Sequence, residues 1–341
     1  MSATLKLSFD VLEISTRHPF TIARGSSGTY RRVWVRLTDE DGVEGWGEAD
    51  PSSYYGETAD TVVAALRQLE PILPHGPFDL EHADAAMLRI LGGAPAARAG
   101  VSAALHDLVG KRLGVPLWKL WGLDPSAAPL SSFTIGLDAP EVVRAKVREA
   151  EAYPILKIKV GTPEDEAMLR AVRDVTDKPL RVDANAGWTP QQAIARLPLL
   201  EEMGVELVEQ PVAPGDREGL AAVHRASRIP IVADESCKVA ADIPGLAGAV
   251  DGISIKLAKC GSLREALRMI AVARAHRLSV MVGCMIETSL GITAAAHFTP
   301  LLDFVDLDGA ALLAQDPFAG ATIAGGRVTL PTAPGLGVTK R

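Results

Sequence analysis

Hydrophobic and polar residues follow two different patterns along this chain, and the first pattern is typical of an antiparallel sheet. Apolar and polar residues alternate over Leu5–Ile14, Arg31–Thr38 and Val43–Ala49, and an Asp-Glu-Asp-Gly sequence at 39–42 separates the last two segments. Alternation of period two predicts strands with one buried face, and the Asp-Gly step predicts a hairpin turn. We therefore expect a meander of strands rather than a βαβ unit.

Apolar residues then recur at helical spacing. Thr58–Leu73 and Ala83–Leu91 show this spacing, and Arg98–Leu113 predicts a helix of small residues that Gly114 and Pro116 should end. Strands followed by helices, without regular alternation of the two, indicate an α+β unit. We expect this unit to span residues 1–125.

From about Ser131 the pattern changes to short apolar runs, each followed by a helical pattern of ten or more residues. Alternation of strand and helix predicts a parallel sheet. Eight such runs can be identified by their sequences, which are SSFTIGL, PILKIKVG, PLRVDAN, VELVEQP, IPIVADES, GISIKLAKCG, LSVMVGCM and DFVDLDG.

Charged residues at the ends of successive runs support a closed barrel over an open doubly wound sheet. They recur about every 25 residues, the length of a strand, a helix and two loops, and are Lys159, Asp183, Glu209, Asp234 and Lys256. Charged groups at the carboxyl ends of barrel strands are typical of an active site. The predicted fold is α/β, a modified TIM barrel of (β/α)7β form at residues 126–314, capped by residues 1–125. The tail at 315–341, with its Gly, Pro and short alternating runs, is expected to complete the cap.

Composition and charge narrow the classes of partner. The chain has 341 residues, of which 48% are hydrophobic and 23% charged, as in soluble globular proteins. A net charge of −7 argues against nucleic acid and anionic membranes as partners, because both attract basic surfaces. No run of apolar residues is long enough to span a membrane. We expect a small-molecule substrate.

Location is predicted from the N-terminus and the cysteines. The first residues lack the basic and apolar regions of a secretory signal, so we expect the mature protein to begin here. Cys237, Cys260 and Cys284 are too far apart for a CxxC pair. Free thiols are typical of a reducing compartment, and we expect a cytoplasmic protein.

Three acidic residues at neighbouring strand ends predict a metal site. Asp183, Glu209 and Asp234 end adjacent strands of the predicted barrel, where their carboxylates would converge. Closely spaced carboxylates repel one another, so we expect a bound cation between them. We expect no lysine or arginine side chain to be placed there instead. A ligand set of oxygens without His or Cys favours Mg²⁺, or Mn²⁺, with one ion per subunit.

Lysines on opposite sides of the barrel predict proton transfer. Lys157 and Lys159 lie two residues apart and so point to the same face of their strand, and Lys256 ends a strand four positions further round. Lys159 and Lys256 should then face each other across the barrel mouth. A metal-bound carboxylate can accept charge as an enediolate when its α-proton leaves. Two bases on opposite faces of that planar species would allow inversion, so we expect a racemase or epimerase.

Several motifs together resemble the muconate lactonizing subgroup of the enolase superfamily over essentially the whole chain. They are KIKVG, VDAN, VEQP, VADES and IKLAKCG, with the segment AGVSAALHDLVGKRLGVPLWKLWG. Within that subgroup the chain is most similar to the dipeptide epimerases, through HPFTIARGS, GCMIETSLGITAAAHF and DLDG. The resemblance implies a Mg²⁺-dependent isomerase that inverts the α-carbon of the second residue of a dipeptide, such as L-Ala-D/L-Glu. We also expect a homo-oligomer.

The same resemblance suggests the residues that would bind the substrate. It implies that Asp306 and Asp308 contact the α-ammonium of a dipeptide, that Arg24 contacts a glutamate side chain, and that Asn185 supports the metal ligands. Each has a simpler reading: the two aspartates as a helix cap beside a solvated acid, and Arg24 as an exposed loop residue. Tyr54 and Tyr55 could close over the site or pack beneath the same loop.

Two other functions remain open at this stage. N-succinylamino acid racemases and o-succinylbenzoate synthases resemble the chain in their metal ligands and lysines, but their substrates have no ammonium group for Asp306 and Asp308. A non-catalytic ligand-binding barrel is the alternative of another class, and its expected signature is the loss of a metal ligand or lysine. Neither is lost here. No HExxH, GxSxG, P-loop or GxGxxG motif is present, so hydrolase and nucleotide-binding functions have no support.

Overall fold

The chain begins with a three-stranded antiparallel sheet in the computed structural model, which describes residues 5–341. Its strands β1 (Lys6–Ile22), β2 (Gly25–Thr38) and β3 (Glu44–Ala49) pair in that order. The predicted meander is confirmed, but the β1–β2 hairpin is much longer than expected. The added segments carry exposed polar residues, and strand pairing through the backbone needs no apolar alternation.

The extended hairpin reaches the mouth of the barrel. Its tip is tied there by a hydrogen bond of 2.9 Å from the Leu137 backbone N–H to the Thr21 carbonyl. Arg24 lies in the turn between the two strands. A residue of the first domain is thereby brought to the end of the barrel where the charged residues lie.

Helices cover the three-stranded sheet on one side. The described helices of this part are α1 (Ala59–Leu69), α2 (Leu80–Ile90), α3 (Pro95–Leu113) and the short α4 (Leu117–Leu120), with 3₁₀ turns η1 (Ser53–Tyr55) and η2 (Glu70–Ile72). All the predicted helices are confirmed, and α3 ends at Gly114, whose φ of 71° places it in the left-handed region. A Cβ on Gly47 would lie 2.1 Å from the carbonyl oxygen of Gly100, so β3 packs directly on the backbone of α3.

Eight parallel strands form the barrel, and all eight predicted runs contain one. The strands are β4 (Phe133–Ile135), β5 (Leu156–Lys159), β6 (Leu180–Asp183), β7 (Val205–Glu209), β8 (Ile231–Ala233), β9 (Gly252–Ile255), β10 (Ser279–Gly283) and β11 (Phe304–Asp306), paired in sequence order. The first and last are joined by a bridge between Ser131 and Val305, with a 3.0 Å hydrogen bond from the Ser132 N–H to the Val305 carbonyl. These contacts close the ring.

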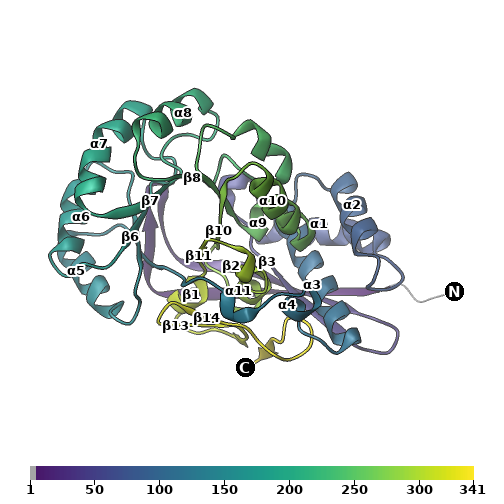
Figure 1. Ribbon diagram of the computed structural model, residues 1–341. Helices are drawn as coiled ribbons and strands as arrows, with labels where there is room; N and C mark the ends of the chain where they lie inside the picture. The colour runs from purple at the N-terminus through teal and green to yellow at the C-terminus, as the bar shows by residue number, and fades with distance from the viewer. Residues whose placement is uncertain (1–4) are drawn as a thin grey trace.

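Helices on the outside of the barrel connect successive strands, as Figure 1 shows for the arc from α5 to α8. They are α5 (Pro140–Glu149), α6 (Asp165–Arg173), α7 (Pro190–Glu202), α8 (Arg217–Ala226), α9 (Leu257–Cys260), α10 (Leu263–Ala275) and α11 (Ser289–Ala296). The expectation of a long helix after every strand is wrong between β8 and β9. That connection contains only the 3₁₀ turn η4 (Ala240–Gly245), because Pro244 has no N–H to continue a helix.

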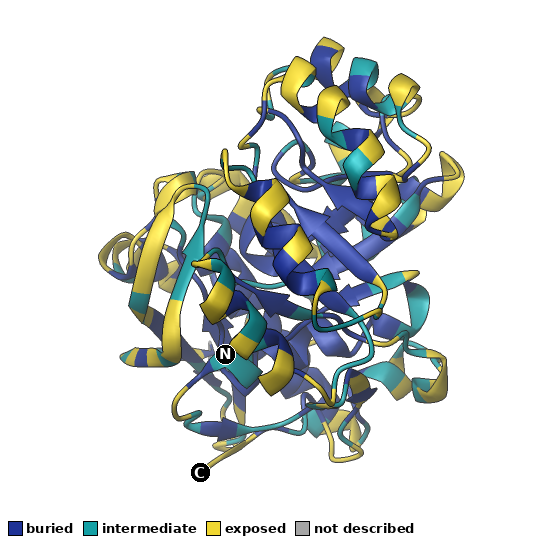
Figure 2. Ribbon diagram, turned by 90° about the vertical axis from the view of Figure 1, so that its left-hand side faces the viewer, coloured by how far each residue is buried: buried dark blue, intermediate teal, exposed yellow. Residues whose placement is uncertain are grey.

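Burial follows this architecture. Figure 2 shows buried residues along the barrel strands and exposed ones on the outer faces of the surrounding helices. A second core lies between the three-stranded sheet and α1–α3, and includes Val35, Leu66 and Leu105. No helix within residues 5–341 is long and apolar enough to cross a membrane. All three cysteines are free thiols.

The last part of the chain returns to the first domain. After the 3₁₀ turns η5 (Thr299–Leu301) and η6 (Gly309–Leu312) come the short strands β12 (Phe318–Ala319), β13 (Thr322–Ala324), β14 (Arg327–Thr329) and β15 (Thr339–Lys340). The Phe318 ring lies edge-on to Trp34 of β2, with ring centroids 5.3 Å apart. The Leu336 N–H donates a 2.7 Å hydrogen bond to Asp107 of α3. The tail therefore links the barrel to the first domain.

Candidate active site

A cavity of about 530 Å³ lies at the carboxyl ends of the barrel strands, under the β1–β2 hairpin. It is lined by residues from both domains, including Arg24, Tyr54, Lys157, Lys159, Asn185, Lys256, Asp306 and Asp308. Seven of these eight residues were predicted from the sequence as site residues, and Tyr54 as one of two residues of open role. The fold brings them to one cavity.

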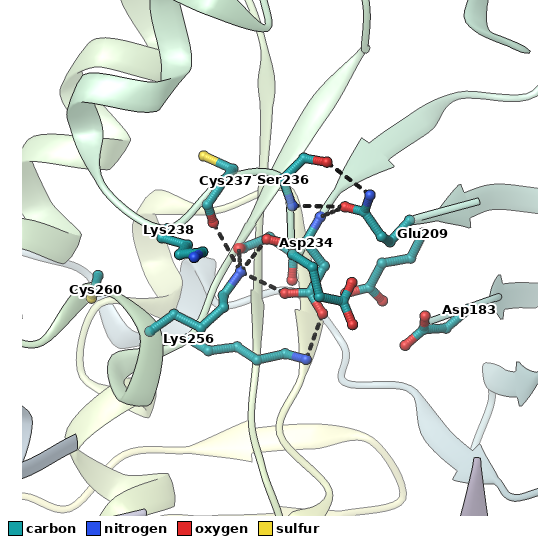
Figure 3. A network of polar contacts seen from close by, with 12 residues as sticks. Asp183, Glu209, Asp234, Ser236, Cys237, Lys238, Lys256 and Cys260 are labelled. Atoms are coloured by element: carbon teal, nitrogen blue, oxygen red, sulfur yellow. Dashed lines mark hydrogen bonds and ion pairs between the residues drawn. The ribbon is translucent and has the colours of Figure 1, made fainter. Parts of the chain in front are cut away.

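The predicted metal ligands lie behind this cavity, fully buried. Asp183 ends β6, Glu209 ends β7, and Asp234 directly follows β8, so the three come from adjacent parallel strands. Their side chains project into the same region, as Figure 3 shows, with Lys256 beside Asp234. Parallel strands end at the same edge of a sheet, so this proximity follows from the strand order.

Lysine side chains lie among these carboxylates, which corrects the expectation that no protein cation is placed there. Lys157 Nζ lies 2.5 Å from Glu209 Oε2 and 3.2 Å from Asp183 Oδ2. Lys159 Nζ lies 2.6 Å from Asp183 Oδ2, and Lys256 Nζ lies 2.7 Å from Asp234 Oδ2. The strands that supply the lysines point them to the same interior face as the acids. As the side chains stand, no group of three His, Cys, Asp or Glu residues within residues 5–341 is arranged to hold a metal ion.

The three carboxylates differ in their electrostatic surroundings. Burial alone would raise the pKa of Asp183, but Lys159 and Lys157 outweigh it and hold that pKa well below its usual range. Lys256 and Lys259 have the same effect on the pKa of Asp234. Burial raises the pKa of Glu209 to about 7, although Lys157 opposes the shift. Glu209 is therefore the carboxylate whose charge is least compensated.

The donor set nevertheless fits a hard divalent cation. Both carboxylate oxygens of Glu209 are buried; Oε2 is ion-paired with Lys157, whereas Oε1 has no hydrogen-bond partner in the described part of the chain. Buried carboxylate oxygens normally have such partners, and a bound cation would supply one. Asn185 holds Asp183, one of the predicted ligands, because its backbone N–H and its side-chain amide donate to that carboxylate at 2.9 and 3.2 Å.

Lys159 and Lys256 meet the geometric expectation for two opposed bases. Lys159 is the last residue of β5 and Lys256 directly follows β9, and these two strands are four apart in a ring of eight. Both side chains line the same cavity and are nearly buried. The carboxylates of β6, β7 and the β8 end lie on the strands between them. A molecule in the cavity can therefore contact a lysine from either side of the barrel.

Asp306 and Asp308 are both buried, so the reading of one as a solvated acid is wrong. Asp306 already has partners: Lys157 Nζ at 2.7 Å from its Oδ2, and the Ser132 hydroxyl, which donates to its Oδ1 at 2.7 Å. Asp308 accepts a 2.6 Å hydrogen bond from the Thr134 backbone N–H and takes part in no ion pair within residues 5–341. Burial, reinforced by Asp306, raises the pKa of Asp308 to about 7. The two aspartates therefore have different partners.

Arg24 is held in place at the rim of the cavity. Its Nη1 donates to the Asn185 carbonyl at 2.7 Å and to Glu235 Oε1 at 2.8 Å. The Tyr54 ring lies against the guanidinium, 4.2 Å from its carbon, and Tyr55 packs edge-on beside Tyr54. Arg24 is therefore an exposed residue of the turn, as the simpler reading has it, but it is ion-paired with Glu235. Tyr54 lines the cavity, whereas Tyr55 packs beside it.

Among the buried charged residues near the site that were missed in the sequence, two adjoin or contact Asp234. Glu235 directly follows Asp234, and its side chain is only 1% exposed. Lys259 Nζ lies 2.5 Å from Asp234 Oδ1 and donates to the carbonyls of Cys237 and Ser254. Both stand inside motifs already singled out, VADES and IKLAKCG, so a second charge within each motif was the available signal.

Comparisons with known proteins agree with this arrangement. Residues 8–122 match the family model described as "Mandelate racemase / muconate lactonizing enzyme, N-terminal domain", and residues 141–341 match "Enolase C-terminal domain-like". The chain is 43% identical to an L-Ala-D/L-Glu epimerase of Bacteroides thetaiotaomicron, over 98% of this chain and 88% of that protein. It is 39% identical to a hydrophobic dipeptide epimerase of Roseobacter litoralis, over 96% of each chain.

A solved structure extends the similarity to the fold. The dipeptide epimerase of Enterococcus faecalis, crystallised with Mg and the dipeptide L-Leu-L-Tyr, superposes with a TM-score of 0.94 at 35% identity. The match covers 98% of this chain and 99% of that one. Both domains and the site between them are therefore included in the likeness.

Proposed function

Because the chain belongs to the mandelate racemase and muconate lactonizing enzyme family of the enolase superfamily, we propose that it epimerises dipeptides at the α-carbon of the second residue. The preferred substrate in this proposal is L-Ala-D/L-Glu. The barrel at residues 126–314 supplies the reacting groups, and the cap of residues 1–125 and 315–341 supplies Arg24. The three free cysteines of the chain favour a reducing compartment such as the cytoplasm.

One observation carries the proposal: Lys159 and Lys256 enter the same cavity from opposite sides of the barrel. A carbon that loses its proton to one side and regains a proton from the other is inverted. Lys159 serves one configuration and Lys256 the other, each as the base for its own isomer and as the acid for the opposite one. Lys157, held by three carboxylates, keeps its charge beside the site and balances the acids.

Asp183, Glu209 and Asp234 hold one Mg²⁺ in this proposal, and Mn²⁺ is its closest substitute in ligand preference. A bound ion would supply positive charge to stabilise the negative charge that develops on the substrate carboxylate when the α-proton leaves. Asn185 fixes Asp183 in position through its two hydrogen bonds. The buried Oε1 of Glu209, which has no hydrogen-bond partner among residues 5–341, is the observation that favours such an ion.

The far side of the cavity suits the free amino group of a dipeptide. Asp308 is buried, lines the cavity and has no cationic partner among the described residues, so an α-ammonium group would complete its charge pairing. Asp306 adds negative potential while it holds Lys157. At the opposite rim, Arg24 offers a cation to an acidic side chain. These charges favour a dipeptide over an N-succinyl amino acid, which brings no ammonium group.

Proton exchange in deuterated water tests the proposal. The enzyme is supplied with Mg²⁺ and incubated with Ala-Glu, Ala-Leu and N-succinyl-glutamate, and deuterium at the α-carbon is followed by NMR. We expect exchange and inversion at the second residue of the dipeptides, with Ala-Glu the fastest. If N-succinyl-glutamate is the best substrate, the chain is a racemase of acylated amino acids; if none of these compounds and no member of a wider dipeptide library exchanges, the non-catalytic alternative holds.

A further inference from the structure

We infer that Glu235 is a positioning residue that sets the selectivity of this site, because it holds the Arg24 guanidinium and balances its charge. The inference rests on the proposed function and adds to it. It concerns which second residues a dipeptide substrate can carry, and it assigns that choice to a pair of residues rather than to Arg24 alone.

The contact itself joins the two domains. Arg24 comes from the turn of the β1–β2 hairpin, and Glu235 follows β8 in the barrel. Their charged atoms, Nη1 and Oε1, lie 2.8 Å apart. The hairpin tip is mostly exposed, whereas Glu235 is fixed inside the barrel wall. Glu235 is therefore the rigid member of the pair, and its contact fixes the position of the more exposed Arg24.

The hydrogen bonds leave one edge of Arg24 free. Nη1 donates both to Glu235 and to the Asn185 carbonyl, and within residues 5–341 the Nε and Nη2 groups donate no hydrogen bond. One face of the guanidinium is covered by the Tyr54 ring at 4.2 Å. A planar group clamped at one nitrogen and one face keeps its remaining N–H groups in a defined direction. Two such N–H groups match the two oxygens of a carboxylate.

The exposure of the two partners separates their roles. The Arg24 side chain is 31% exposed and lines the cavity, while the Glu235 side chain is 1% exposed and does not. Glu235 can therefore act on a substrate side chain through Arg24, but not by contact. Asn185 strengthens the clamp, because its side-chain amide donates to the same Glu235 oxygen at 3.4 Å.

The pairing of Arg24 with Glu235 has a second consequence, for substrates with an apolar second residue. The Arg24 guanidinium is already paired with the Glu235 carboxyl group at 2.8 Å, so an apolar side chain that covers Arg24 does not have to desolvate an unpaired guanidinium. The cavity wall near the hairpin also contains Phe20, Ile22 and Ile286, which suit an apolar side chain. We therefore infer an enzyme that prefers acidic second residues and still accepts apolar ones, with the ratio set by Glu235.

Two substitutions of Glu235 separate positioning from charge. Glu235→Gln keeps an oxygen that can accept from Arg24 but removes the balancing charge, so the ratio of kcat/KM for Ala-Glu over Ala-Leu should rise about threefold to tenfold. Glu235→Leu removes the acceptor, and the ratio should fall about tenfold, mainly through a higher KM for Ala-Glu. Arg24→Met should lower the ratio by a similar factor. Because Glu235 acts through Arg24, the double variant Arg24→Met with Glu235→Leu should fall no further than Arg24→Met.

Controls distinguish this effect from damage to the fold or to the metal site. Glu206→Gln removes a carboxylate of β7 that pairs with Arg181 away from the cavity, and it should leave the ratio unchanged. Mg²⁺ affinity, measured by calorimetry for each variant, reports any effect that passes through the neighbouring Asp234. Binding of Ala-Glu, measured in the same way, gives the selectivity without turnover.

The inference is overturned if Glu235→Leu lowers Ala-Glu and Ala-Leu equally, if its effect adds fully to that of Arg24→Met, or if it follows the change in Mg²⁺ affinity. These results differ from a failure of the proposed function. If the proposed function fails, the unmodified enzyme will neither bind nor epimerise any dipeptide, and the selectivity assigned to Glu235 will fail together with the proposed function.

Discussion

Asp306 and Asp308 should affect catalysis through different kinetic constants, although only one residue separates Asp306, which ends β11, from Asp308, which precedes η6. Asp306 already pairs with Lys157 at 2.7 Å, and Lys157 in turn contacts Asp183 and Glu209. Asp308 has no cationic partner among the described residues and lines the cavity. Asp306→Asn should therefore disturb the charged cluster behind the substrate, whereas Asp308→Asn should remove a contact to the substrate itself.

The size of both effects follows from burial. Removing one partner of a desolvated, hydrogen-bonded charge pair typically costs about 2–5 kcal/mol, a factor of about 30 to several thousand. For Asp308→Asn we expect the lower end, about 30-fold, as a higher KM for dipeptides with little change in kcat, because Thr134 still holds the loop from its backbone. For Asp306→Asn we expect a loss of similar or larger size in kcat, because Lys157 loses one of its three carboxylate partners, and the other two, Asp183 and Glu209, are proposed metal ligands.

The assay compares Ala-Glu with propionyl-Glu, which has the same shape but no α-ammonium group. Initial rates of α-deuterium exchange give kcat and KM for both compounds with the unmodified enzyme and the two variants. With propionyl-Glu, Asp308→Asn should have almost no effect, while Asp306→Asn should lower kcat as it does with Ala-Glu. An equal increase in KM for both variants, seen with Ala-Glu only, would refute this division of roles. It would show that both aspartates bind the ammonium group.

Three further outcomes are expected. Exhaustive chelation should abolish α-proton exchange and added Mg²⁺ should restore it, because the buried Oε1 of Glu209 has no hydrogen-bond partner in the described chain. Full turnover of the chelated enzyme would contradict the metal assignment. Lys159→Ala and Lys256→Ala should each abolish epimerisation yet leave deuterium exchange in one configuration only, which chiral chromatography of the exchanged dipeptide can show; equal residual exchange from both isomers would contradict opposed bases. Burial lowers the pKa of His297 from 6.5 to about 4, so the unfolded chain binds its proton first on acidification, and the free energy of unfolding of the enzyme relative to His297→Gln should fall between about pH 6.5 and 4. Urea unfolding of both proteins across that range checks the sign, and a difference that stays constant would show that His297 does not titrate as a buried group.

The sequence alone determined the architecture of the barrel. Strands buried on both faces are rich in apolar residues, so a run such as LSVMVGCM can be recognised without knowing its neighbours. A charged residue at the end of such a run is expected to lie at the carboxyl edge of the sheet. Lys159, Asp183, Glu209, Asp234 and Lys256 were therefore found by position, and strand order brings them together.

Only the tertiary structure decided what these residues contact. Periodicity reports the face to which a side chain points, but a partner from a distant segment leaves no periodic signal. Three such contacts join segments far apart in the chain: Lys157 with Glu209, Lys157 with Asp306, and Arg24 with Glu235. The second of these contacts gives Asp306 a partner that Asp308 does not have. The long β1–β2 hairpin was missed for a related reason: its outer half is held by backbone pairing and contact with the barrel rim, which place no demand on the pattern of its side chains.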